Sequence, residues 1–210
     1  MRTVRSSPPL RTLAAVLAVP LLATRALPAQ APAPPGPPLP EAGQVASAVL
    51  PLPAEFRSAA RVLGYRAGNT RLVTLREGAG PFVCLASDPA VARFHVACYH
   101  QSLEPFMARG RALRAQGVTG DRVDSTRFAE VRAGKLAMPR QPAALYSLTG
   151  PAGSFDPATG VATGARQLFV IYIAGATAAS TGLAAQPAEG TPWIMFPGTP
   201  KAHIMFVPRM

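Results

Sequence analysis

Apolar residues recur at helical spacing in two stretches of the chain. From Ser102 to Gly117 they form one stripe with the arginines off it, and the serine and the glycine suit the two ends of a helix. The stretch from Leu52 to Tyr65 has a similar stripe after Pro53, so it also predicts a helix. Residues 125–135 add a helical turn or two. The first stripe consists of Leu103, Phe106, Met107, Gly110 and Leu113.

Shorter apolar runs between turn residues predict strands. Two runs within residues 70–86 flank the glycine-rich turn Glu77–Gly80, which is typical of a β-hairpin. The other runs also come in neighbouring pairs and do not alternate with helices. About six strands with two or three helices therefore predict a single α+β domain with a mainly antiparallel sheet. The later strands are expected at residues 143–150, 166–175, 193–196 and 203–207.

Residues 1–29 have the order of a secretory signal peptide. Arg2, Arg5 and Arg11 precede an apolar run from Thr12 to Ala23, and small residues follow it. The run is too short to span a bilayer, which takes roughly 20 apolar residues. We expect export by the Sec route, cleavage after Ala29 and no transmembrane span in the mature protein. The location would then be periplasmic or extracellular.

A Pro/Ala-rich linker, residues 30–45, is expected after the signal peptide. The stretch 28–40 holds seven prolines, each without an N–H and with a fixed φ, so it predicts an extended spacer. Composition becomes ordinary for a folded protein near Glu41. The α+β domain is expected at residues 46–210, a length sufficient for one hydrophobic core.

The chain is basic, with 21 Lys and Arg against 10 Asp and Glu. Removing the four arginines of the signal peptide leaves 17 against 10, a net charge of +7. Eight of the basic residues lie between Arg109 and Arg140, but Phe128 is the only aromatic residue among them. Nucleic-acid surfaces usually add aromatic platforms to such a cluster. We therefore expect a solvated arginine-rich face and no nucleic-acid partner, with attraction to an anionic envelope component left open.

The two cysteines, Cys84 and Cys98, predict a disulfide bond, because a lone cysteine pair in an exported chain is most simply read as one bridge. A metal site and free thiols are the alternatives. Together with His95 and His100 the cysteines have the side chains of a tetrahedral zinc site, but their spacing matches no standard motif. His95 and His100 would also point in different directions in either a helix or a strand.

A second metal hypothesis adds His203, which begins the last expected strand. If the terminal hairpin lay beside the strand of Cys84, His203 could approach His95 or His100, and three converging histidines would suit a transition metal. No nucleophile elbow, H-E-x-x-H, Walker A, dinucleotide-binding or C-x-x-C motif occurs. No cofactor is therefore predicted, and a protein that is not an enzyme is favoured.

Four stretches resemble a family of small exported bacterial proteins with a signal peptide, a cysteine pair and a C-terminal hairpin that carries a histidine. The pieces LREGAGPFVC and PGTPKAHIM are the most specific part of the resemblance, which covers most of residues 61–206. The family brings no established activity. The resemblance therefore implies one domain after the linker and no particular ligand or site residue.

The leading hypothesis for function is a non-enzymatic periplasmic or secreted module that binds a small ligand or an envelope component. Aromatic side chains would line its pocket, and the candidates are Tyr99, Tyr146, Tyr172 and Trp193. A metal-dependent enzyme that uses the histidines is one alternative. A structural envelope protein attracted through its arginine face is the other, and its binding would be sensitive to salt.

Overall fold

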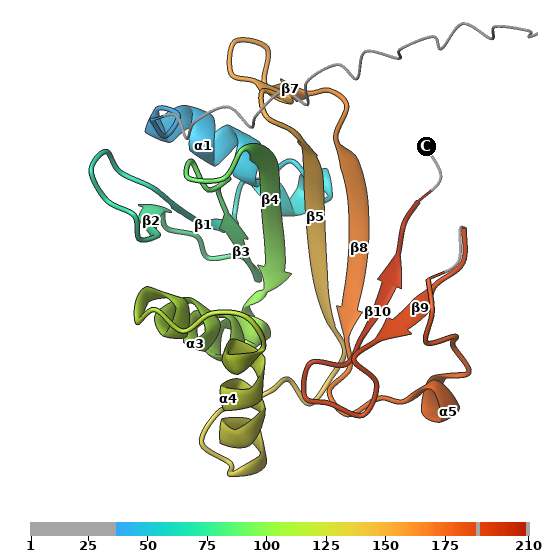
Figure 1. Ribbon diagram of the computed structural model, residues 1–210. Helices are drawn as coiled ribbons and strands as arrows, with labels where there is room; N and C mark the ends of the chain where they lie inside the picture. The colour runs from blue at the N-terminus through green and yellow to red at the C-terminus, as the bar shows by residue number, and fades with distance from the viewer. Residues whose placement is uncertain (1–36, 188–189, 209–210) are drawn as a thin grey trace, which may run out of the picture. The chain divides into compact units, whose positions relative to one another are not determined.

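The computed structural model describes residues 37–187 and 190–208 (Figure 1). The expected signal peptide, residues 1–29, and the first part of the expected linker lie outside this range. Residues 41–45, also assigned to the linker, form the first half of a helix, α1. The described chain is organised around one large sheet and a separate two-stranded hairpin.

The large sheet has eight strands in the order β2-β1-β3-β4-β5-β8-β10-β9. All neighbours are antiparallel except β1 and β3, so the predicted α+β class with a mainly antiparallel sheet is confirmed. The predicted numbers of strands and helices were too low. The strands are β1 Arg61–Gly64, β2 Val73–Arg76, β3 Phe82–Leu85, β4 Arg93–His100, β5 Ala143–Pro151, β6 Phe155–Asp156, β7 Val161–Ala162, β8 Arg166–Tyr172, β9 Trp193–Met195 and β10 His203–Phe206. The α-helices are α1 Glu41–Ala48, α2 Ala54–Arg57, α3 Glu104–Ala115, α4 Asp121–Arg132 and α5 Ala178–Thr181, and a 3-10 turn, Gln101–Leu103, precedes α3.

The predicted helix from Leu52 to Tyr65 is wrong in its second half. Only α2 is helical there, and β1 begins four residues after it. Val62 is fully buried and its neighbour Leu63 is 5 % exposed, so both sides of this strand are covered. A strand buried on both faces has no alternating pattern, and its apolar run cannot be distinguished by period from a short helix.

The predicted hairpin of residues 70–86 is also wrong, because β1 lies between β2 and β3. Gly78 and Gly80 pass close to the chain that enters β1, and the Gly80 N–H donates to the Ala59 carbonyl oxygen at 2.8 Å. A Cβ on Gly78 would lie 2.4 Å from that same oxygen. The glycines are therefore needed for close backbone contact and not for a tight hairpin turn.

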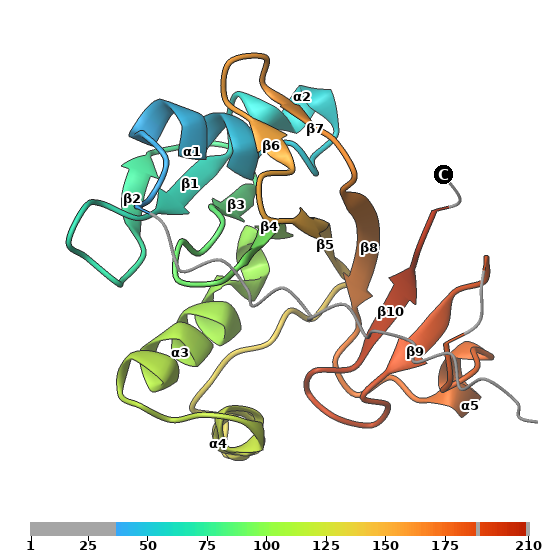
Figure 2. The same cartoon turned by 45° about the horizontal axis from the view of Figure 1, so that its top comes forward.

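The two faces of the sheet carry different helices (Figure 2). The core around α1 and α2 contains Val62, Cys84 and Cys98, whereas the core on the other face contains Leu63, Val83 and Tyr99. Successive residues of a strand point to opposite faces, so each strand contributes to both cores. Leu103, just before α3, and Met107 of α3 pack in the second core.

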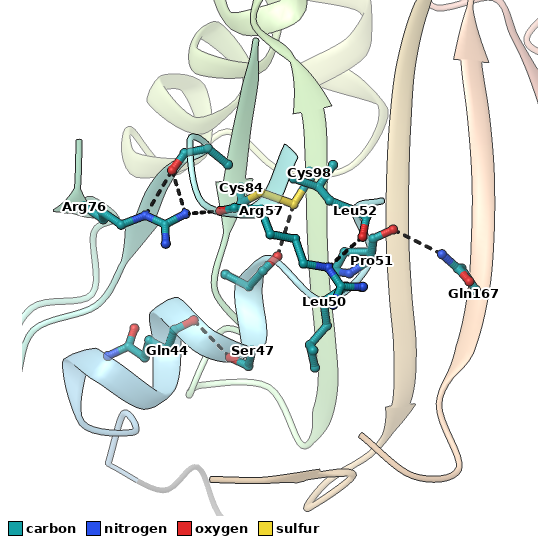
Figure 3. Close-up of a disulfide and its surroundings, with 12 residues drawn as sticks. Gln44, Ser47, Leu50, Pro51, Leu52, Arg57, Arg76, Cys84, Cys98 and Gln167 are labelled. Atoms are coloured by element: carbon teal, nitrogen blue, oxygen red, sulfur yellow. Dashed lines mark hydrogen bonds between the residues drawn. A yellow bond between two sulfur atoms is a disulfide. The ribbon is translucent and has the colours of Figure 1, made fainter. Parts of the chain in front are cut away.

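The predicted disulfide is present and joins β3 to β4 (Figure 3). Cys84 and Cys98 are directly opposite each other, with Cα atoms 4.0 Å apart, and both are fully buried. The bond lies inside the sheet, because β3 and β4 each have a further neighbouring strand. The Cys98 Sγ is 3.1 Å from the Ala48 carbonyl oxygen, and because a disulfide sulfur has no proton to donate, this is a packing contact with α1.

Gln44 attaches α1 to the end of β1. Its side-chain N–H groups donate to the carbonyl oxygens of Tyr65 and Leu39, each at 2.7 Å, and its Oε1 accepts the Tyr65 N–H at 2.8 Å. Gln44 is 4 % exposed. One buried side chain therefore satisfies both backbone groups of the residue that follows the strand.

We expect replacement of Gln44 by methionine, which has a similar size, to lower the free energy of unfolding by about 2–4 kcal/mol, because it leaves two buried backbone groups of Tyr65 without partners. Urea denaturation followed by circular dichroism measures the change. Gln141→Met, at an exposed position, is the control. Equal midpoints for the two variants would contradict the proposed role of Gln44.

The disulfide should stabilise the fold by about 3 kcal/mol, since it closes a loop of 14 residues. The double variant Cys84→Ala/Cys98→Ala should have a free energy of unfolding lower by that amount, and so a lower urea midpoint. Adding a reductant should lower the urea midpoint of the wild type and leave that of the double variant unchanged. Alkylation of two thiols in the native, unreduced protein would contradict the bond.

Candidate functional site

A hollow on the α3 face of the sheet is the candidate site. It consists of two adjoining cavities of about 630 and 410 Å³, which share Tyr65, Leu72, Asp88 and Arg114. Binding pockets for small molecules typically measure roughly 300–1,000 Å³. The first cavity is also lined by Thr70, Arg71, Arg111, Ala112 and Ala115, and the second by Leu85, Ala86, Ser87, Val91, Arg93, His95 and Ala97.

Three segments that are distant in sequence form the hollow. The second half of α3 supplies one wall, and the connection from β1 to β2 supplies another with Arg71 and Leu72. The connection from β3 to β4 and the first half of β4 complete it with Asp88, Arg93 and His95. The insertion of β1 between β2 and β3 is what brings these segments together.

The hollow carries an excess of positive charge. Arg71, Arg93 and Arg114 are exposed, and none has an ion-pair partner within the described chain. Asp88 is the one carboxylate among the lining residues. Its Oδ1 accepts the Ala90 N–H at 2.9 Å, so it is occupied with its own loop. Three guanidinium groups against one carboxylate favour an anionic ligand.

A partly buried polar network beside this hollow holds α3 against the sheet. The Tyr99 hydroxyl donates to Glu104 Oε2 at 2.5 Å, and Arg111 donates to the same hydroxyl at 2.7 Å and to Glu104 Oε1 at 2.6 Å. Burial of Tyr99, which is 1 % exposed, raises the pKa of its hydroxyl well above the ordinary value. Because Glu104 neutralises Arg111, this arginine positions the wall and adds little net charge.

Tyr65 contributes a neutral hydrogen-bond donor to the hollow. Burial, and secondarily the negative charge of Asp88, raises the pKa of its hydroxyl to about 12. The phenol therefore stays protonated at all physiological pH values. Gln44 positions its backbone, as described above.

His95 lines the second cavity as a neutral side chain. Its Nδ1 is 2.7 Å from Thr149 Oγ1 on the neighbouring strand. Burial, and secondarily the charge of Arg93, lowers the pKa of the imidazole below 6.5. It therefore adds polarity without adding charge near pH 7.

The other two predicted metal ligands lie elsewhere. His100 ends β4 on the opposite face from His95, and its Nδ1 is 2.8 Å from Ser102 Oγ. His203 begins β10, and β5 and β8 separate it from β4, a distance of about 14 Å at the usual strand spacing. The condition on which the three-histidine hypothesis rested, a terminal hairpin beside the Cys84 strand, is thus not met. The described residues contain no group of three or more His, Cys, Asp or Glu that could hold a metal.

The four aromatic residues predicted to line a pocket do not line this hollow. Tyr99, Tyr172 and Trp193 are buried, at 1 %, 7 % and 8 % exposed. Tyr146 lies on the opposite face, in edge contact with Phe82 and Phe169. Tyr65 is the aromatic residue of the hollow, and it was not among the expected pocket residues because the pattern from Leu52 to Tyr65 predicted a helix that ends there.

His203 is held as a neutral side chain between two aromatic rings, those of Tyr172 and Phe196. Its Nδ1 is 2.7 Å from the Lys201 carbonyl oxygen, and because a carbonyl only accepts, this nitrogen carries the proton. Burial lowers the pKa of the imidazole below 6.5. His203 therefore has a structural role in attaching the turn before β10.

Taken together, the hollow offers unpaired guanidinium donors, a phenol donor and apolar side chains, a combination suited to binding.

No known protein family, curated protein or solved structure matches the chain. Within residues 37–187 and 190–208, no helix has both the length and the apolar content needed to cross a membrane.

The lowered pKa values of His95 and His203 predict acid sensitivity. The unfolded chain binds protons at these two histidines more readily than the native protein does. The free energy of unfolding is therefore highest above pH 6.5, where both states hold neutral histidines, and it decreases as the pH falls below 6.5. Urea midpoints at pH 7.5, 6.5 and 5.5 measure this loss. His203→Asn retains a side-chain donor but does not titrate, so its midpoint should decline less. An equal decline in this variant would show that His203 is not responsible.

Proposed function

We propose that the protein is an exported, non-enzymatic module that binds a small anionic ligand in the hollow between α3 and the sheet. The observation that carries the proposal is the set of three unpaired arginines, Arg71, Arg93 and Arg114, around cavities of ligand size. The disulfide inside the sheet supports export, because such bonds persist in oxidising compartments.

The distribution of acidic residues supports the choice of these arginines. Nearby arginines on α3 and α4 are paired: Arg109 with Glu130, Arg111 with Glu104, and Arg127 with Asp124. Arg127 also lies over the Phe106 ring at 3.9 Å, so it is part of the core. The arginine cluster between residues 109 and 140 is thus partly structural. Arg71, Arg93 and Arg114 have no ion-pair partner within the described chain, and unlike the exposed arginines of α4 they lie around cavities of ligand size.

The recessed position of the apolar residues distinguishes this proposal from a structural envelope protein. Leu72, Leu85 and Ala97 are half-buried, whereas Arg71 and Arg114 are exposed around them. A flat anionic surface would contact the arginines and leave the cavities empty. A small ligand would fill them.

The test uses 8-anilinonaphthalene-1-sulfonate, a fluorescent sulfonate with an apolar body, as the probe. The native protein should bind it saturably, and Arg71→Gln/Arg114→Gln should weaken binding at least about tenfold, because charge-assisted hydrogen bonds of this kind contribute roughly 1.5–3 kcal/mol each. Arg122→Gln/Arg132→Gln, two exposed arginines on α4, should bind as the wild type does.

Circular dichroism of each variant verifies that binding is measured on folded protein. Equal weakening by the hollow pair and the α4 pair would mean that overall charge attracts the probe. In that case the assignment of the site to the hollow would be wrong.

A further inference from the structure

The hollow has an apolar floor as well as a charged rim. Leu72 and Leu85 pack against the core of the α3 face, and Ala97 lies beside them on β4. The α3 wall adds Ala112 and Ala115, which present methyl groups and no hydrogen-bonding side chain. A ligand with only polar groups would leave this floor in contact with water.

The positive charges are placed around the floor. Arg71 belongs to the first cavity, Arg93 to the second, and Arg114 to both. A guanidinium group binds a carboxylate through two parallel hydrogen bonds, which suits a single planar anionic group. Asp88, at the junction of the two cavities, opposes a ligand with several negative charges more strongly than a ligand with one.

Tyr65 favours the same class of ligand. Tyr65 lines both cavities, and its hydroxyl stays protonated, so it is able to donate to an anionic oxygen. His95, which also lines the second cavity, is neutral and adds no charge to it. The hollow thus combines a monoanion site at the rim with an apolar surface behind it.

We propose that the hollow binds a single-chain organic monoanion, a medium-chain fatty carboxylate, with its carboxylate against the arginines and its chain over Leu72, Leu85 and Ala97. This inference rests on the proposed function and names its ligand class. A membrane surface is not the expected partner, because the floor is recessed behind exposed arginines.

The test displaces 8-anilinonaphthalene-1-sulfonate from the wild-type protein with hexanoate, octanoate and decanoate below their micellar concentrations. Each added CH₂ should tighten displacement about two- to fourfold, since apolar area is removed from water. Decyltrimethylammonium, which has an alkyl chain one carbon longer and the opposite charge, should displace the probe at least about tenfold more weakly than decanoate. Acetate and inorganic phosphate should displace it weakly.

Leu85→Ser should flatten the dependence on chain length, because it removes part of the floor. Leu168→Ser is the matched control, since Leu168 is also a half-buried leucine on this face of the sheet but does not line the hollow. The chain-length series on the wild type stands even if either variant fails to fold.

The possible failures are distinguishable. If phosphate or acetate displaces the probe as well as decanoate does, the ligand is a small anion, which overturns this inference and leaves the proposed function in place. If decyltrimethylammonium matches decanoate, the floor binds chains without regard to charge, and the inference is also overturned. If the arginine substitutions leave probe binding unchanged, the proposed function itself fails.

Discussion

The insertion of β1 between β2 and β3 is the constraint on which the rest of the structure depends. It gives β1 a parallel partner on one side and an antiparallel partner on the other, and it requires Gly78 and Gly80 where the chain passes the start of β1. The same insertion places Tyr65 and Leu72 beside α3. The connection from β1 to β2 is thus one wall of the hollow.

Two successive residues of β4 then join the layers. Cys98 points to the α1 face and is bonded to Cys84, while Tyr99 points to the α3 face and is held by Glu104 and Arg111. The alternation of strand side chains thus links a covalent bond on one face to a polar network on the other. In this network Glu104 neutralises the charge of Arg111, and other carboxylates likewise neutralise Arg109 and Arg127. Because these carboxylates pair with arginines of α3 and α4, the arginines at the hollow have no carboxylate partner and remain able to bind an anion.

The parts of the fold that depend on local pattern were predictable. The helix α3, the strands β5, β8, β9 and β10 and the antiparallel α+β class follow from periodicity and turn residues. The disulfide followed from the number of cysteines and the expected compartment. The order of β1, β2 and β3 was not predictable, since a short apolar run buried on both faces has no period of its own. The candidate site was missed for the same reason, because Arg71, Arg93 and Arg114 become neighbours only through that order.

The sequence by itself therefore determined the class of fold, the pairing of the two cysteines and the basic character of the chain. These properties depend on composition and on contacts between near neighbours. Only the tertiary structure decided that the three histidines stay apart, that the predicted pocket tyrosines are buried or face the other way, and that unpaired arginines line two adjoining cavities with an apolar floor. Each of these depends on which strands lie side by side, and strand order is set by the burial of the whole sheet and not by any one segment.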